Sequence, residues 1–147
     1  MKGKSIKNIF VDGAVSAQKI TEDIQKHATQ TGIGAHSIFL GQVRADEKDG
    51  EAVTAIEYTA YNEMALQKMH AIRESLFAKY SLSCMHVYHS LGLVPVGGLC
   101  LFVFVSSQHR KDAIDACEEL VEAIKFQLPI WGREIYNSKN SVWKENR

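Results

Sequence analysis

Apolar residues recur at helical spacing between residues 61 and 80. They stand three or four residues apart, at Tyr61, Ala65, Met69, Ile72, Leu76 and Tyr80. A stripe with this spacing lies on one side of an α-helix and is typical of a helix packed against a core. The pattern predicts a helix of about five turns over this stretch. Met64 and Met69 are interpreted as core residues in preference to ligands, because methionine commonly fills gaps in cores.

A second stripe predicts a helix later in the chain. Its members are again three or four residues apart, at Ala113, Cys117, Val121 and Ile124. Ser106 and Ser107 precede the stripe and can cap the free amides of a first turn. Pro129 follows it and cannot continue a helix. We therefore expect a helix that begins near His109 and ends before the proline.

A shorter helical pattern follows Ser16 near the start of the chain. Its apolar face consists of Ile20, Ile24 and Ala28, and two glycines, Gly32 and Gly34, mark its end. The charges along it alternate in sign. We interpret it as a structural helix without a role in chemistry.

Strand patterns fill most of the remaining chain, over residues 5–11, 35–43, 52–61, 82–88, 99–107 and 130–136. Gly41 predicts a bulge or the close approach of another backbone. The polar turn 45–52 predicts a hairpin of the strands on either side of it, and 91–98 predicts a second turn. Strands outnumber helices and are mixed among them. This order favours an α+β fold with a mixed, largely antiparallel sheet, helices packed on it, and a single domain over residues 1–147.

Composition narrows the function classes. The chain has 147 residues, 46% of them hydrophobic and 23% charged, as in an ordinary globular protein. Lys plus Arg and Asp plus Glu both number 17, so no overall basic field favours nucleic acid. We find no signal peptide and no apolar run long enough for a membrane span. The three cysteines, Cys84, Cys100 and Cys117, are interpreted as reduced core residues of a cytosolic protein.

Candidate chemistry gathers at the two ends of the second long helix. Lys125 lies four residues after Val121, so it projects from the edge of the apolar stripe and can reach a cleft. From its position alone, a simple interaction with the helix dipole is the favoured explanation. His109 and Arg110 stand at the helix N-terminus, where an anion is stabilised. An ordinary solvated helix start is the alternative there.

Two histidines on one predicted strand raise the question of a metal site. His86 and His89 could bind an ion, but no third ligand follows at a useful spacing. A packed or hydrogen-bonded histidine is the favoured interpretation. We predict no metal site and no cofactor.

Five motifs in order resemble the family of molybdopterin synthase large, catalytic subunits. They cover nearly the whole chain: FLGQVR, EYTAYNEMA, VYHSLG, SSQHRKDA and AIKFQLPIWGRE. The resemblance implies a hammerhead-like α+β fold and a cytoplasmic enzyme of molybdenum cofactor biosynthesis. Such an enzyme transfers sulfur to a cyclic pyranopterin monophosphate, called precursor Z, to form the molybdopterin dithiolene. It also implies two partners: a second copy of the chain, and a small ubiquitin-like subunit with a C-terminal Gly-Gly thiocarboxylate, in a heterotetramer.

The resemblance also implies roles for individual residues. Lys125 becomes the catalytic residue and a substrate ligand, as acid, base or oxyanion stabiliser. The substrate phosphate would be bound by four cationic residues, Arg44, His109, Arg110 and Arg147, the last acting across the dimer. The carrier tail would run along apolar residues, for which we select Phe39, Met64 and Ile130 by position.

One departure from the family pattern bears on activity. The family has a second lysine after the tryptophan of AIKFQLPIWGRE, where this chain has Gly132. Either Arg133, Lys139 or Lys144 compensates for the missing charge, or the enzyme is slower or has lost part of its activity. Two milder departures are Ser90 and Gly98. An alternative hypothesis is therefore a noncatalytic module that binds the pterin phosphate and the carrier without turnover. A third is a small-molecule regulatory α+β domain.

Overall fold

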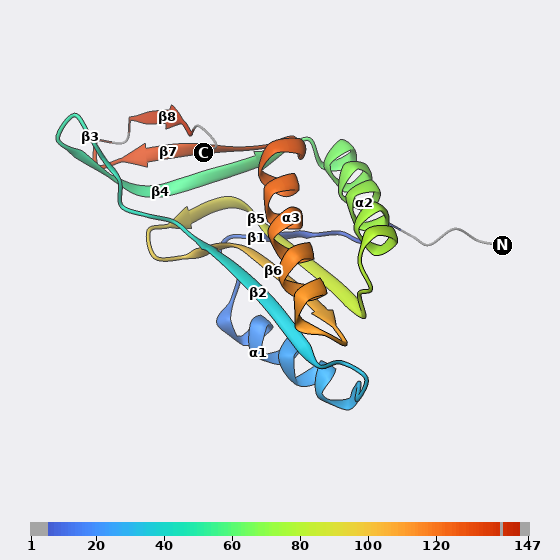
Figure 1. Cartoon of the computed structure of the whole chain (residues 1–147). Helices are drawn as coiled ribbons and strands as arrows, with labels where there is room; N and C mark the ends of the chain where they lie inside the picture. The colour runs from blue at the N-terminus through green and yellow to red at the C-terminus, as the bar shows by residue number, and fades with distance from the viewer. Residues whose placement is uncertain (1–5, 139, 145–147) are drawn as a thin grey trace.

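The computed structural model describes residues 6–138 and 140–144 (Figure 1). The helices are α1 (Ala17–Lys26), the 3-10 turn η1 (His27–Thr29), α2 (Asn62–Lys79) and α3 (Arg110–Gln127). The strands are β1 (Phe10–Asp12), β2 (Ala35–Gln42), β3 (Glu47–Lys48), β4 (Glu51–Ala60), β5 (Cys84–Pro95), β6 (Leu99–Ser107), β7 (Ile130–Tyr136) and β8 (Ser141–Trp143). The fold is α+β, as the sequence predicted.

The strands form one mixed sheet in the order β2-β6-β5-β4-β7-β8. Among the described strands, only β1 runs parallel to its neighbour β5; the other pairs are antiparallel. Strand β5 pairs with β6 through its first half and with β4 through its second half. In Figure 1 the β4-β7-β8 ribbon consequently lies across one end of the β2-β6-β5 group, which gives the hammerhead-like outline.

Helices α2 and α3 cover one face of the sheet, and α1 covers the other. The first face is the main core, in which Leu101, Val103 and Val105 of β6 pack with both long helices. On the second face Phe102 and Phe104 of the same strand pack with residues before and within α1. All five β6 side chains are fully buried because side chains alternate along a strand covered on both sides.

The two long helices confirm their predicted stripes. In α2 the buried residues are Ala65, Met69, Ile72 and Leu76, and in α3 they include all four predicted positions, Ala113, Cys117, Val121 and Ile124. The prediction for Met64 was wrong, because its side chain is 42% exposed on the first turn of α2. None of the helices within residues 6–138 and 140–144 is long and apolar enough to cross a membrane.

Two predicted connections were wrong. Strand β2 pairs with β6, and the hairpin partner of β4 is the two-residue strand β3, closed by Asp49 and Gly50 with positive φ. The expected turn over 91–98 is also mostly strand, because β5 continues to Pro95 in order to pair with β4. The bulge expected at Gly41 is confirmed by a register shift between Gly41 and Gln42.

The first helix differs from its prediction in the face it buries. Ser16 caps α1 as expected, its Oγ accepting from the Lys19 amide at 3.1 Å. The helix ends at Lys26, before the glycines, and Ile24 is 42% exposed. The buried residues here are polar: Asp23 and His27. Of the strand expected over 5–11, only its end belongs to β1, and residue 5 lies outside the described part.

Candidate active site

Lys125 lies on the last turn of α3, where the helix meets the start of β7. Its side chain is partly buried. Burial lowers the pKa of Lys125, the Lys144 ammonium lowers it further, and Cys100 opposes the change. A lysine with a lowered pKa can act as acid or base nearer neutrality than an exposed one.

The surroundings of Lys125 include His89 on β5 and Tyr58 on β4. His89 is 5% exposed, and its Nδ1 donates to the Ser90 carbonyl at 2.8 Å. Burial lowers the pKa of His89 to about 4, and the charge of Lys125 adds to the effect. The rings of Tyr58 and His89 meet edge to face, 5.2 Å apart. Burial, with Cys100 next to it, raises the pKa of Tyr58. The imidazole and the phenol are thus both held neutral.

Gly132 on β7 lies directly opposite Tyr58 in the β4–β7 ladder. A Cβ at this position would stand 2.9 Å from Ile56 Cγ2 and 3.2 Å from Tyr58 Cε1. Ile56 is buried and cannot move aside freely. The glycine therefore leaves room for the Tyr58 ring, a packing reason for its presence that the sequence pattern did not reveal.

The three cations that could compensate for Gly132 differ in their positions and partners. Arg133 is engaged on β4, where its Nη2 pairs with Glu57 Oε1. Lys144 lies beside Gly132, since its amide donates to the Gly132 carbonyl at 2.8 Å, and its charge acts on Lys125. Lys139 lies outside the described residues. Lys144 is thus a cation whose backbone lies beside Gly132 and whose charge acts on Lys125.

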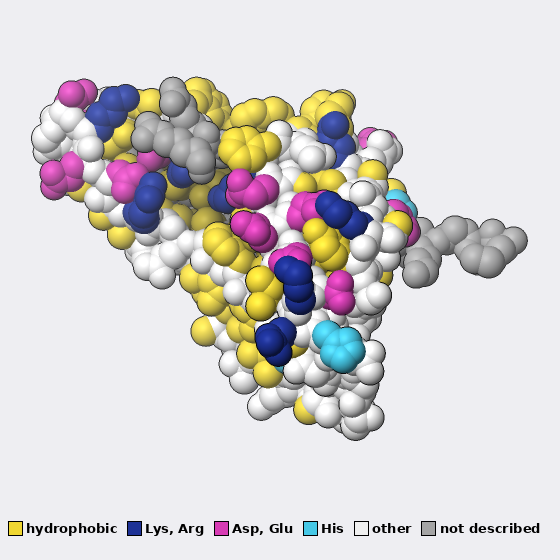
Figure 2. Space-filling model, viewed as in Figure 1, with side chains coloured by type: hydrophobic (Ala, Val, Ile, Leu, Met, Phe, Trp, Pro, Cys, Tyr) yellow, Lys and Arg dark blue, Asp and Glu magenta, His cyan; other side chains and the backbone are white. Residues whose placement is uncertain are grey.

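Arg44 lies in a cleft at the β3–β4 end of the molecule. The cleft has a volume of 790 Å³, and its lining also includes Glu134, Trp143 and Lys144. The Arg44 side chain is 74% exposed, and its Nη2 lies 3.2 Å from Asp46 Oδ2. Figure 2 shows basic and acidic side chains next to each other over this end of the surface. The guanidinium is available to an anion that displaces the exposed carboxylate.

His109 and Arg110 lie at the opposite end of α3. Lys125 follows Arg110 by 15 residues of continuous helix, which corresponds to about 22 Å along the axis. His109 is the N-cap but makes no side-chain cap. Ser107 caps the helix instead: its hydroxyl accepts a hydrogen bond from the Ala113 amide at 3.1 Å and donates one to the His109 carbonyl. Within one chain, His109 and Arg110 therefore lie far from Lys125.

The apolar residues selected for a tail channel differ in their exposure: Phe39 and Ile130 are partly buried, whereas Met64 is exposed. Ile130 starts β7 and packs against both the main core and the cluster around Tyr58, whereas Phe39 on β2 packs against the main core. Met64 is exposed on the first turn of α2, close in sequence to Tyr61, whose amide donates to the Pro129 carbonyl at 3.0 Å. Arg147 lies outside the described residues.

Fold and site together define an α+β protein whose candidate active site surrounds a partly buried lysine at a helix end. The chain belongs to the MoaE protein family, whose model matches residues 14–127. It is 39% identical over 121 residues to the molybdopterin synthase catalytic subunit of Oryza sativa subsp. indica, covering 82% of this chain and 62% of that protein. The Bos taurus protein of the same name is 37% identical over 114 residues, covering 78% of this chain and 60% of its own length. The chain thus spans less than two thirds of these curated relatives.

Solved structures give the same fold. Molybdopterin synthase from Staphylococcus aureus superposes with a TM-score of 0.81 at 30% identity, covering 96% of this chain and 99% of that one. A complex of subunits 1 and 2 of molybdopterin-converting factor from Helicobacter pylori superposes with a TM-score of 0.79 at 20% identity, covering 94% of this chain and 90% of that one. The second likeness shows the fold alone.

Proposed function

We propose that this protein is the catalytic subunit of a molybdopterin synthase, acting as one domain over residues 1–147. It transfers sulfur from the thiocarboxylated C-terminus of a small ubiquitin-like carrier to a cyclic pyranopterin monophosphate, precursor Z. The observation that carries the proposal is Lys125, partly buried with a lowered pKa in the family motif and electrostatically coupled to Lys144. A cytoplasmic location is supported by the free state of all three cysteines.

The chemistry needs a group that moves protons and one that stabilises negative charge. The thiocarboxylate sulfur attacks a substrate carbon, a C–S bond forms, and oxygen leaves as water or phosphate. Water then cleaves the acyl C–S bond, which releases the carrier as a carboxylate and leaves a thiol on the substrate. Neutral Lys125 can accept a proton, and its ammonium form can protonate the leaving oxygen or stabilise the acyl oxyanion. Two such rounds make the dithiolene.

The substrate phosphate requires cations, and two of the predicted ones, His109 and Arg110, are not brought to Lys125 within the same chain. His109 and Arg110 lie about 22 Å away along α3. We therefore propose that a second copy of the chain supplies its His109–Arg110 end to the Lys125 end of the first. Arg44 is the nearer candidate within the same chain, because its cleft also contains Lys144. A homodimer is then a condition for activity, and two carrier subunits complete a heterotetramer.

The carrier tail would reach Lys125 along an exposed apolar rim. Tyr61 is 60% exposed, Met64 42% and Trp131 51%. Tyr61 and Trp131 stand on neighbouring chain segments, because β4 and β7 pair up to Ala60 and Ile130. Aromatic and methionine side chains suit an extended peptide that must dock and leave. Lys125 lies six residues before Trp131 in the chain.

A single-turnover assay tests the proposal. The protein is mixed with thiocarboxylated carrier and pyranopterin monophosphate, and dithiolene is measured for the wild type, Lys125→Ala and Lys111→Ala. Lys111 lies on the same helix, exposed and paired with Asp115, so it controls for the loss of a lysine. We expect Lys125→Ala to lose about 100-fold or more in rate, the range for a proton-transfer group, and Lys111→Ala to retain it. Equal rates in all three proteins would refute the role of Lys125.

Mixed dimers test the shared site. Neither Lys125→Ala nor Arg110→Ala homodimers should be active, but a heterodimer of the two should regain one intact site. Recovery of about half the wild-type rate per dimer is the expected result. A heterodimer as inactive as its parents would show that the two ends of α3 serve separate sites.

The noncatalytic alternative keeps one observation in its favour, the missing ammonium at Gly132. It predicts that the wild type binds carrier and substrate but forms no dithiolene. The single-turnover assay separates it from the enzyme, since binding is measured in the same mixtures by calorimetry.

A further inference from the structure

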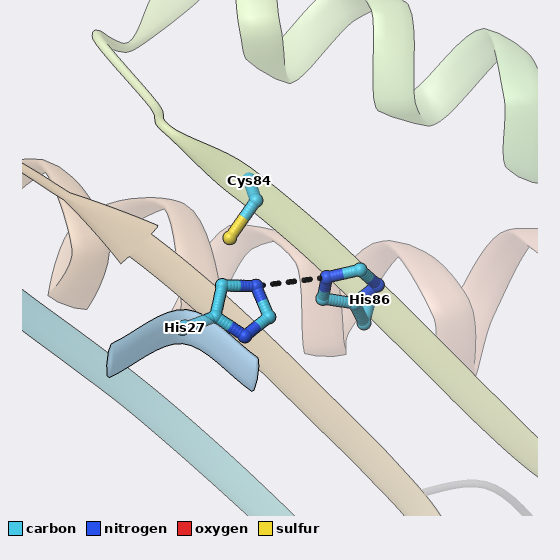
Figure 3. Close-up of side chains that lie close together, drawn as sticks. All are labelled: His27, Cys84 and His86. Carbon is cyan, nitrogen blue, oxygen red and sulfur yellow. Dashed lines mark hydrogen bonds between the residues drawn. The ribbon is translucent and has the colours of Figure 1, made fainter. Parts of the chain in front are cut away.

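A cluster of histidine and cysteine side chains lies on the α1 face of the sheet, away from the candidate active site. It consists of His27 on η1 with Cys84 and His86 on β5 (Figure 3). The three potential ligand atoms all lie within 4.8 Å of one another, and the two Nε2 atoms are 3.2 Å apart. His86 and His89 stand three residues apart on the strand, so they face opposite sides of the sheet. The active-site histidine is therefore not part of this cluster.

The His27 ring is oriented as a ligand would be. Its Nδ1 lies 2.6 Å from the Asp23 carbonyl, which can only accept a hydrogen bond. Nδ1 therefore carries the hydrogen, and Nε2 presents a lone pair to the cluster. A backbone carbonyl that fixes the tautomer in this way is the usual second partner of a metal-binding histidine.

A buried negative charge accompanies the cluster. Asp23 is 4% exposed, and its Oδ2 has no hydrogen-bond partner among the described residues. Its Oδ1 lies 3.5 Å from Lys19 Nζ. The Asp23 carboxylate favours the protonated form of His86, whereas the cationic Lys7 and Arg73 disfavour it. Lys19 already supplies one cation to this carboxylate, and a metal ion at the cluster would add a second positive charge to the same buried region, where one carboxylate oxygen has no hydrogen bond.

The spacing of the two ligand nitrogens fits a tetrahedral metal ion such as zinc. Two nitrogens bound at 2.0–2.1 Å to tetrahedral zinc stand about 3.3 Å apart, close to the 3.2 Å between the two Nε2 atoms. Imidazole and thiolate together favour zinc among the common divalent ions. We propose that His27, Cys84 and His86 bind a zinc ion, with water in the fourth position. The ion would join the end of α1 to the start of β5.

The plain alternative is a hydrogen bond between the two imidazoles. In that case His86 Nε2 carries a hydrogen and donates it to His27 Nε2, and the thiol is a spectator. Only the zinc site requires the Cys84 sulfur, so the test compares metal binding with and without it.

Zinc affinity of the whole, metal-stripped protein is measured at pH 7.5 by competition with a chromophoric chelator. Cys84→Ser and His86→Gln remove ligands. The matched controls are Cys117→Ala, which removes a cysteine on the other face, and His36→Gln. His36 is a neighbouring histidine, its ring 6.0 Å from that of His27, and its Nδ1 is already held by Ser106 Oγ. Circular dichroism checks that each variant is folded.

We expect one zinc per chain in the wild type and both controls, and affinity at least about 10–100-fold weaker in Cys84→Ser and His86→Gln. Zinc at a hundredfold excess over its Kd should raise the wild-type Tm by about 5–10 °C. Cobalt in place of zinc should give a sulfur-to-metal charge-transfer band that Cys84→Ser lacks. No measurable zinc binding, or equal affinity in wild type and Cys84→Ser, would overturn the proposal.

Discussion

His89 makes the stability of the folded protein depend on pH in a calculable way. Its pKa falls from the ordinary 6.5 to about 4 on folding, mainly through burial. Between these values the unfolded chain holds a proton on His89 and the folded protein does not. Protons therefore favour the unfolded chain, so the stability is fully present above pH 6.5 and is lost as the pH falls toward 4.

The size of the effect follows from the two pKa values. Between pH 7.5 and pH 5 the difference in proton binding at His89 removes about 2 kcal/mol of unfolding free energy. His89 is almost fully buried, so no solvent screening reduces this figure. The titratable groups that face it are Lys125 on α3 and Tyr58 on β4, and the Tyr58 phenol stays neutral across this range.

Urea unfolding at pH 7.5 and pH 5 measures the prediction. The wild type should lose about 2 kcal/mol more than His89→Gln between the two pH values, whatever the absolute stability of the variant. His70→Gln, on the outer part of α2, controls for the loss of an imidazole. If His89→Gln kept the whole pH dependence of the wild type, the assignment of this effect to His89 would be refuted.

Three further changes test other parts of the structure. Gly132→Ala should cost about 1–3 kcal/mol through overpacking and should be tolerated in an Ile56→Ala background, where the contact at 2.9 Å is gone; equal costs in both backgrounds, measured by urea unfolding, would contradict the packing argument. Ser107→Ala should cost about 1–3 kcal/mol, because the first turn of α3 then has a buried, unpaired amide; an unchanged urea midpoint would show that water replaces the hydroxyl. Lys144→Ala should raise the pKa of Lys125 and so move to higher pH the limb of the pH–rate profile that reports Lys125, the acidic limb if the neutral amine is the active form and the alkaline limb if the ammonium is. An unmoved limb would remove Lys144 from the site.

The sequence predicted the elements better than their partners. The stripes of α2 and α3 were visible because burial on one helix face leaves a period in the chain. Pairing leaves no such period, so nothing in residues 35–61 revealed that β2 pairs with the distant β6. The length of β5 was hidden for a related reason: Gly92 and Pro95 look like turn residues, yet β5 continues through them in order to pair with β4.

The candidate site was predictable only as a set of residue types. Lys125 stood out by its place at the edge of a stripe, and its partial burial agrees with that. The predicted length of α3 already gave the distance between its two ends. That distance matters because His109, Arg110 and Lys125 are proposed to contact the same substrate. The metal cluster could not be found by spacing, because His27 comes from a different part of the chain. Cys84, two residues before His86, was the available signal.

Strand β5 contributes to both ends of the molecule, so a change in its length affects both of them. Its first half carries Cys84 and His86 on one face and His89 on the other, while its second half supports the ladder that holds Gly132 through β4. Gly92, with φ of +81°, stands where the strand changes partners. A one-residue insertion before this point would reverse the faces of one half relative to the other. An insertion within β5 would therefore disturb both the face that carries Cys84 and His86 and the ladder that holds Gly132. A change of length in the β3–β4 turn would leave both in place.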